Sequence, residues 1–335
     1  MSARHARLMI VGLAVAALCA GMTGLMVGAY PVGLDGLGAA LAHLTSGPQT
    51  PEERVILTIR GPRVLAGLLV GASLAAAGTV YQGLFRNPLV SPDVLGVAAG
   101  AGLGAVFGIF LSLPVVLIQA LAFGSGLATV GFVFAIAAAV RGRDPTLVLV
   151  LGGVVAGALA GAALSLLKIL ADPYDQLPAI TFWLLGSLAS VRGGQVGSML
   201  PGVALGLVPL ILLRWRINVL SLGDDEAKAL GLDVSRLRAL VIAAATLMTA
   251  TVVAISGVIG WVGLIIPHIA RMLIGPNFER LLPAAMLLGA AYLVLVDTLA
   301  RSIARVEVPI GILTAVAGAP FFLWLLRRSR DGGAP

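Results

Sequence analysis

Apolar segments long enough to cross a lipid bilayer recur along almost the whole chain. The first runs from Leu8 to Ala29, which exceeds the roughly 20 residues that a transmembrane helix needs. Hydrophobic residues make up 59% of the sequence and charged residues only 11%, with a mean hydropathy of +1.05. A soluble domain carries about a quarter of its residues as charged side chains. The sequence therefore predicts an all-α, polytopic membrane protein.

About ten spans and one short helix account for this pattern. A cleaved signal peptide would have a shorter apolar region than the first run, so we expect that run to remain as a span. The second span begins at Val64 and is stopped by Asn87–Pro88, because the residue before a proline is pushed out of the helical region. The other spans are expected at about 93–111, 113–140, 146–170, 196–213, 239–257, 260–271, 281–300 and 308–326, all within a single domain of residues 1–335.

The short helix is expected at residues 179–190. This segment is apolar, but it has too few residues to cross a bilayer. It therefore predicts either a re-entrant or interfacial helix, or a surface helix with no part in transport.

Basic residues indicate how the spans are oriented. Most of the 22 Lys and Arg residues fall in segments that share a side with both termini. Because cytoplasmic loops are rich in Lys and Arg, we expect both termini and the polar interval 218–238 in the cytoplasm. This bias explains the formal charge of +7 without a nucleic-acid partner. Cys19 is the single cysteine, so no disulfide can form within the chain.

The sequence shows no catalytic constellation. Lys168 and Lys228 are its two lysines, and neither follows a glycine, so the chain has no Gly-x-x-x-x-Gly-Lys phosphate loop. The 3 histidines are scattered, and no Cys/His cluster has the spacing of a metal site. We expect no catalytic residue, no metal site and no bound cofactor in this chain.

The longest polar interval lies between the sixth and seventh spans. Gly223 and Gly231 bracket residues 224–230, and acidic residues begin that segment, where a helix dipole favours them. We expect a short helix between two turns, with Ala227 and Leu230 on one apolar face. Taken alone, the interval is equally compatible with an ordinary solvated loop that contains one helical turn.

Four separated motifs stand out along the chain. They are Arg60-Gly-Pro-Arg63, Arg86-Asn-Pro-Leu89, Leu222-Gly-x-x-x-Ala-x-x-Leu-Gly231 and Gly263-Leu-Ile-Ile-Pro-His-Ile-x-Arg271. In this order they resemble the FecCD-type permease family of ABC importers for iron–siderophores, haem and cobalamin. The resemblance covers nearly the whole chain from Arg60 to Leu326. It implies the type II ABC importer permease fold in a bacterial inner membrane.

The same resemblance implies partners. They are a second permease copy, either identical or related, two cytoplasmic ABC ATPases that use ATP and Mg, and one periplasmic substrate-binding protein. In this family the polar interval is the coupling loop that contacts the ATPase. The residues implied are Leu222, Gly223, Asp224, Asp225, Glu226, Ala227, Leu230 and Gly231.

Two further sets of residues follow from the resemblance. Arg60, Arg63 and Arg301 are implied to receive the binding protein at the outer rim, although snorkelling to lipid headgroups explains arginines there equally well. The translocation pathway is implied along the fifth span, the short helix and the tenth span. Its candidate residues are Ser165, Lys168, Thr181, Ser187 and Thr314.

Cargo and energy source have alternatives. A ferric siderophore or similar metal chelate is the expected cargo, with haem, cobalamin or molybdate as the alternatives. A transporter driven by an ion gradient would need buried carboxylates, and only Asp297 lies near the centre of a span. Asp297 also lies one helical turn from Arg301, close enough to pair with it. A purely structural membrane scaffold would have no need of the long polar interval.

Overall fold

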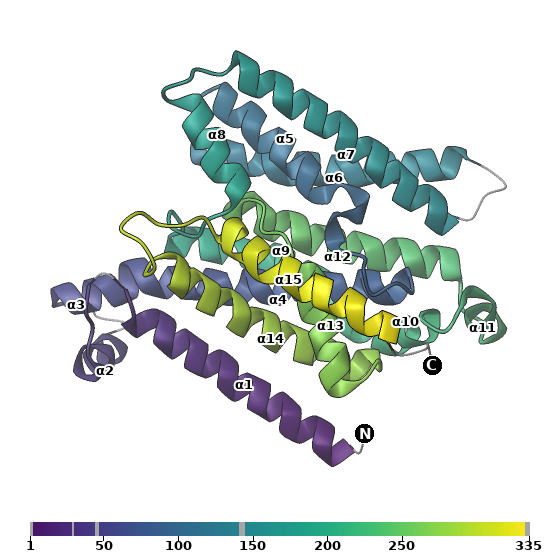
Figure 1. Cartoon of the computed structure of the whole chain (residues 1–335), viewed down its shortest axis with the longest axis horizontal. Helices are drawn as coiled ribbons and strands as arrows, with labels where there is room; N and C mark the ends of the chain where they lie inside the picture. Colours follow the sequence, from purple (N-terminus) through teal and green to yellow (C-terminus); the bar gives the residue numbers. More distant parts are fainter. Residues whose placement is uncertain (1–2, 29, 44–46, 141–144, 332–335) are drawn as a thin grey trace.

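The computed structural model describes residues 3–28, 30–43, 47–140 and 145–331. All regular structure in this part of the chain is helical, as predicted (Figure 1). The long helices are α1 (Ala3–Met26), α4 (Gly61–Leu84), α5 (Val97–Phe110), α6 (Val115–Ala139), α7 (Pro145–Leu170), α9 (Gly193–Leu212), α12 (Val234–Ser256), α13 (Val262–Ile274), α14 (Phe278–Ala300) and α15 (Ile310–Asp331). The short ones are α2 (Leu34–Ala42), α3 (Pro51–Arg54), the π-helix η1 (Val55–Arg60), the 3-10 helix η2 (Pro92–Leu95), α8 (Gln176–Leu185), α10 (Arg214–Leu220) and α11 (Asp224–Ala229).

Each expected span corresponds to a helix. Within the described residues, 7 segments are long and apolar enough to cross a membrane by themselves: α1, α6, α7, α9, α12, α14 and the continuous segment Pro51–Leu84 that ends in α4. The other three expected spans correspond to the shorter apolar helices α5, α13 and the part of α15 from Ile310 to Leu325. The expected short helix is α8, with 10 residues. The chain is a multi-pass membrane protein.

α5 and α13 are short because each is preceded by a loop inside the bundle. Gly96 has a left-handed φ of 77° after the turn of η2, so α5 begins at Val97 rather than near residue 93. A Cβ added at Gly263, near the start of α13, would lie 2.6 Å from Cδ of Pro92. The loops before the two half-length helices therefore meet within the molecule.

α4 runs through the centre of the bundle. Helices α12, α13 and α14 pack around it, and most of its residues are buried. A Cβ at Gly71 would collide with the carbonyl oxygen of Gly289 on α14, and one at Gly78 would collide with that of Gly263 on α13. The small residues of this span allow backbones to approach closely, as in other membrane helix pairs.

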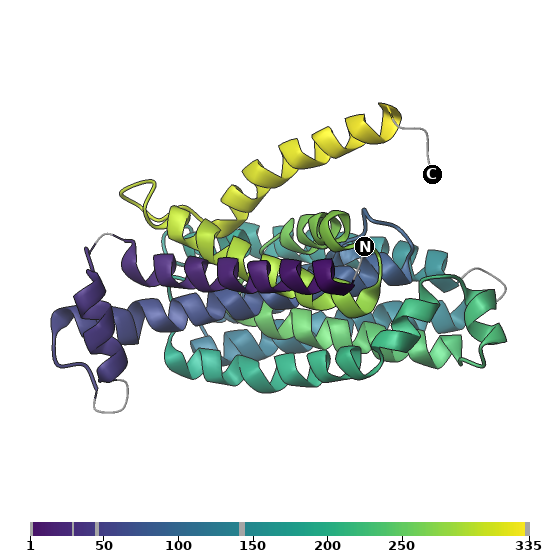
Figure 2. The same ribbon diagram turned by 90° about the horizontal axis from the view of Figure 1, so that it is seen from below.

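Two groups of helices lie side by side around this centre (Figure 1). Helices α5 to α8 form one group, and α12 joins it to the group that contains α4, α9 and α13 to α15 through contacts with α5 and α6. Helix α15 diverges from the bundle toward its C-terminal end, on the side opposite α9 (Figure 2). We call the end of the bundle with α3 the α3 end, and the opposite end, with α10 and α11, the α11 end.

Candidate functional site

The polar interval between α9 and α12 folds into α10 and α11 at one end of the bundle (Figure 1). Helix α11 covers Asp224–Ala229, which confirms the predicted short helix. Gly231 follows it with a φ of 78°, a left-handed conformation that glycine adopts without steric cost.

The predicted apolar face of this helix is wrong. Ala227 is fully buried against the bundle, whereas Leu230 is 57% exposed. Leu230 is the C-cap of α11, one turn after Ala227, and its side chain lies beyond the contact that buries Ala227. Leu222 is 65% exposed, so the two leucines flank the helix as its accessible apolar groups. A partner at this end would meet leucine side chains and an acidic first turn, not Ala227.

Polar contacts brace this segment to two long helices. Arg238 of α12 is buried, and its Nη2 donates to both carboxylate oxygens of Asp224, at 2.7 and 2.9 Å. Asn218 of α10 accepts a hydrogen bond from the backbone N–H of Phe278, at the start of α14, at 3.1 Å. Charge-assisted hydrogen bonds are among the strongest in proteins. These bonds hold α11 to α12 and α10 to α14.

Arg60 lies at the α3 end and is only 4% exposed. Its guanidinium donates to the carbonyl oxygens of Leu25 and Met26, both at 2.9 Å, and to that of Tyr30. These carbonyls include the last ones of α1, which have no partner within the helix. Arg60 thus caps α1 rather than presenting its charge to the surface.

Arg63 bridges two carboxylates at the same end. Its Nη2 lies 2.8 Å from Oδ1 of Asp297 and 2.7 Å from Oε1 of Glu307. Arg301 lies 3.8 Å from Asp297 through its Nε, which confirms the predicted pairing, and it also donates to the carbonyl oxygen of Gly24. Asp297 is 2% exposed.

In this structure the three arginines are therefore paired within the chain, and their role in docking a binding protein stays a prediction. A buried carboxylate and unpaired helix-end carbonyls draw their guanidinium groups inward, because buried polar groups need partners. The basic residues that are exposed at this end are Arg54, Arg192 and Arg305.

Three loops meet at the α3 end of α12, at a cluster that we call the loop junction: Gly186, Ser187, Ser256, Glu307 and Ile310. The backbone N–H of Ser187 donates to the carbonyl oxygen of Ser256 at 2.9 Å, and that of Ile310 donates to Gly186 at 3.0 Å. The Ser187 hydroxyl donates to Oε1 of Glu307 at 3.2 Å. The end of α8, the end of α12 and the start of α15 are thereby joined.

The five pathway candidates do not come together within one chain. Ser165 and Thr181 are exposed and donate to carbonyl oxygens one turn earlier in their own helices. Lys168 is half-buried. Thr314 is fully buried, and its hydroxyl donates to the carbonyl oxygen of Gly311. Ser187 both joins the loop junction and lines a cavity.

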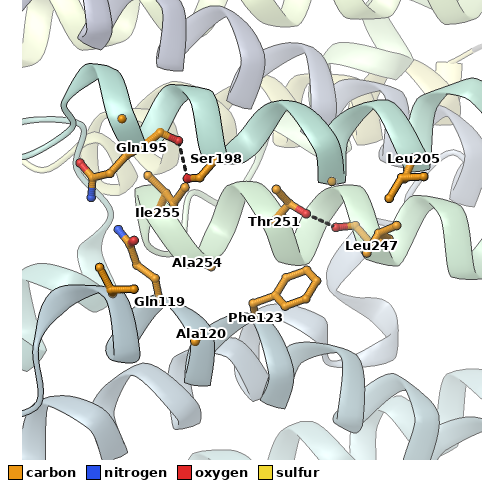
Figure 3. A pocket seen from close by; sticks show the side chains of 13 residues that line it. Gln119, Ala120, Phe123, Gln195, Ser198, Leu205, Leu247, Thr251, Ala254 and Ile255 are labelled. Atoms are coloured by element: carbon orange, nitrogen blue, oxygen red, sulfur yellow. Dashed lines mark hydrogen bonds between the residues drawn. The ribbon is translucent and has the colours of Figure 1, made fainter.

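A groove of about 560 Å³ lies between α6, α9 and α12 (Figure 3). Most of its lining is apolar, and the side chains of Gln119 and Gln195 lie on opposite sides of one end. A second cavity of about 380 Å³ shares Gln119, Ala254 and Ile255 with it and continues to Ser187.

This groove and two residues that brace the structure, Arg238 and Glu307, could not be predicted from local sequence. Gln119 carries an amide within an apolar span. A polar side chain in such a span indicates a polar contact in the membrane. Arg238 and Glu307 have partners on other elements. No local spacing predicts such partners.

Comparisons with known proteins agree with this architecture. Residues 16–328 match the FecCD transport family. The chain is 41% identical to the molybdate import system permease protein MolB of Haemophilus influenzae, over 97% of this chain and 96% of that protein. It is 43% identical to the cobalamin import system permease protein BtuC of Halobacterium salinarum, over 86% of this chain and 78% of that protein.

The fold is similar to that of a solved protein described as a metal-chelate type ABC transporter in an inward-facing conformation. The TM-score is 0.86 at 39% sequence identity, and the match covers 95% of this chain and 98% of that one.

Proposed function

This chain belongs to the FecCD transport family, and on that premise we propose that it is the permease subunit of an ATP-driven, binding-protein-dependent importer of a ferric siderophore or similar metal chelate. The observation that carries the proposal is the braced segment at the α11 end. Exposed leucines there can receive a partner, and the pair of Asp224 with the buried Arg238 links this segment to α12. The chain itself binds no ATP, Mg or other cofactor; a separate ATPase uses them.

The proposed assembly contains two permeases, two ABC ATPases and one substrate-binding protein in a bacterial inner membrane. Both termini and the α11 end face the cytoplasm, in keeping with the distribution of Lys and Arg. The second copy packs on the side that carries α7, α8 and α15. Exposed apolar side chains there, such as Leu159 on α7 and Val316 on α15, at 59% and 67%, suit such a contact.

Force from the ATPase follows a short route in this proposal. The ATPase moves α11, Arg238 carries the movement into α12, and α12 shifts the loop junction at its far end. The junction holds the end of α8 and the start of α15, the elements that the family places beside the pathway. Cargo movement then results from a change in conformation that a partner drives.

The binding protein is proposed to dock at the α3 end. Exposed Arg192 and Arg305 supply the initial attraction for acidic groups. For Arg63 and Arg301 to contact the binding protein, they would exchange Asp297 and Glu307 for its carboxylates. Docking would then loosen the network that holds the start of α15.

Molybdate import is a second candidate function. It is favoured by the similarity to MolB, which spans nearly the whole length of both chains. An ion-driven carrier is not favoured, since Asp297 is already paired with Arg63 and Arg301.

The test is transport in proteoliposomes that contain the permease with its cognate ATPase and binding protein. Leu230→Arg places a charge on the exposed coupling surface, and we expect it to abolish ATP-driven uptake and ATPase association. Leu111→Arg is the control, because Leu111 is similarly exposed, at 48%, but follows α5 at the other end.

Two outcomes would contradict the proposal. Full uptake by Leu230→Arg would remove the coupling assignment. Uptake along an ion gradient without any ATPase would remove the importer assignment. Uptake of molybdate but of no chelate would favour the second candidate.

A further inference from the structure

The groove between α6, α9 and α12 lies away from the side proposed for the second copy. In Figure 2, α9 runs along one edge of the molecule and α15 along the opposite edge. The outward surface beside the groove is apolar, with Val116 on α6 and Leu205 on α9 exposed at 73% and 65%. In a membrane this surface meets lipid.

The length of the groove along α12 matches the thickness of one bilayer leaflet. Together with the cavity that continues it, it follows α12 from Leu247 to Gly257. At a helical rise of about 1.5 Å per residue, this stretch measures roughly 15 Å. The hydrocarbon core of a bilayer is about 30 Å thick, so one leaflet accounts for roughly half of that. The groove thus runs inward from the loop junction at the α3 end for the length of one leaflet.

The polar groups of the groove are uncharged and concentrated at its α3 end. Gln119 and Gln195 lie on opposite sides of it there, and the Oε1 of Gln195 accepts from the backbone N–H of Arg192 at 2.9 Å. The Nε2 of Gln195 and the amide of Gln119 have no hydrogen-bond partner among the described residues. Farther along, Ser198 and Thr251 are satisfied by carbonyl oxygens of their own helices. Free amide donors therefore stand at the mouth, and hydrocarbon lines the interior.

We propose that this groove binds one phospholipid from the leaflet nearer the α3 end. One acyl chain lies along α12 between α6 and α9, and the amides of Gln119 and Gln195 donate to ester or phosphate oxygens of the lipid. Since no charged side chain lines the groove, the site recognises the ester and phosphate oxygens of a phospholipid rather than the charge of its headgroup. Retention of the lipid is therefore insensitive to headgroup charge and to salt.

The bound lipid has a structural consequence. It fills the space between α6, which belongs to the group α5 to α8, and the pair α9 and α12. The site ends beside Ser187 and Gly257, where α8 meets α12. The lipid thereby supports the contact between the two helix groups next to the loop junction.

The first experiment counts lipids on the purified, full-length protein by native mass spectrometry after mild detergent extraction. Wild type is expected to retain one phospholipid per chain. Ala120→Trp fills the groove from its exposed edge and is expected to lower retention at least tenfold. The double variant Gln119→Leu/Gln195→Leu is expected to lower it severalfold. Ala204→Trp, on an exposed position of α9 outside the groove, is the matched control and keeps the lipid.

A second experiment needs no variant. Wild-type protein in vesicles of phosphatidylethanolamine, with or without phosphatidylglycerol, receives a phospholipid with a photoreactive group on its acyl chain. Labelled peptides are expected to cover Phe123, Ser198 and Leu247, equally with both vesicle compositions. Unchanged lipid retention in Ala120→Trp, or labels that avoid these peptides, would overturn the proposal. So would crosslinking of Ser198→Cys to a second copy, which would show that protein covers the groove.

Discussion

The two ends of α12 are held in different ways. At the α11 end, the buried Arg238 ties it to the partly exposed Asp224 of α11. At the α3 end, backbone hydrogen bonds and close glycine contacts fix it to the loops before α9 and α15, beside the charge network of Arg63 and Asp297. One end is held to α11 by one ion pair beside the buried Ala227. The other end is joined to several elements at once.

The largest expected effect is at the α3 end. Asp297→Asn removes the carboxylate that pairs with Arg63 and Arg301, and it leaves both guanidinium groups poorly compensated in a buried site. Breaking a buried ion pair in this way costs about 3–5 kcal/mol. Thermal unfolding in detergent measures it, with Asp175→Asn, an exposed acid, as the control. A loss below about 1 kcal/mol, the size of an average substitution, would mean that the network does not hold this end.

A smaller loss of stability with a larger loss of function is expected at the α11 end. Arg238→Gln removes charge-assisted hydrogen bonds to Asp224, worth about 1.5–3 kcal/mol. Because this contact links α11 to α12, we expect the variant to transport less cargo for each ATP that the ATPase hydrolyses. The rate of ATP hydrolysis itself should fall less. The matched control is Arg236→Gln, whose pair with Asp233 is exposed. Equal coupling ratios in the two variants would show that force enters elsewhere.

Glu307→Gln tests the link between the network and α15. Glu307 is 28% exposed and Arg63 keeps Asp297, so we expect a loss of only about 1 kcal/mol. Amide hydrogen exchange should nevertheless rise in residues 302–312, because the start of α15 loses its charged anchor. Glu279→Gln, in an exposed pair with Arg214, should leave that segment unchanged. Unchanged amide exchange in Glu307→Gln would show that backbone hydrogen bonds alone hold the start of α15.

The smallest effect is expected on the surface of α11. Lys228 pairs with Asp225 at 3.7 Å, and both side chains are well exposed. Such pairs contribute about 0–1 kcal/mol, so Lys228→Gln should hardly change thermal unfolding. A clear loss of stability would show that α11 packs more deeply than its exposure indicates.

The spans and the short helix α11 could be predicted because their signals are local. Long apolar runs mark the spans, and Gly223 and Gly231 with acids between them mark α11. The partners of the arginines could not be predicted in this way. Arg63 and Asp297 are 234 residues apart, and their pairing depends on how α4 and α14 pack. Without that pairing, an arginine at the end of a span looks like a surface charge.

The candidate site was predicted in part for a related reason. The short helix α11 could be predicted, but its accessible face could not, because the burial of Ala227 depends on how α11 packs against the bundle. The groove combines residues from α6, α9 and α12, which are far apart in the sequence. Gln119 and Gln195 are single polar residues on different helices, and only the packing of α6 and α9 shows that both line one groove.

The pairing of Arg63 with Asp297 also determines when α4 can complete its packing during synthesis of the chain. Arg63 leaves the ribosome 234 residues before its partner does. At about 5–20 residues per second, synthesis of the intervening chain takes roughly 10–50 s. During that interval the central helix α4 has neither its counter-charge nor the neighbours that cover its glycines, and Arg63 can reach water only by extending toward the lipid headgroups. The central helix α4 therefore reaches its final packing only after α14 has been made.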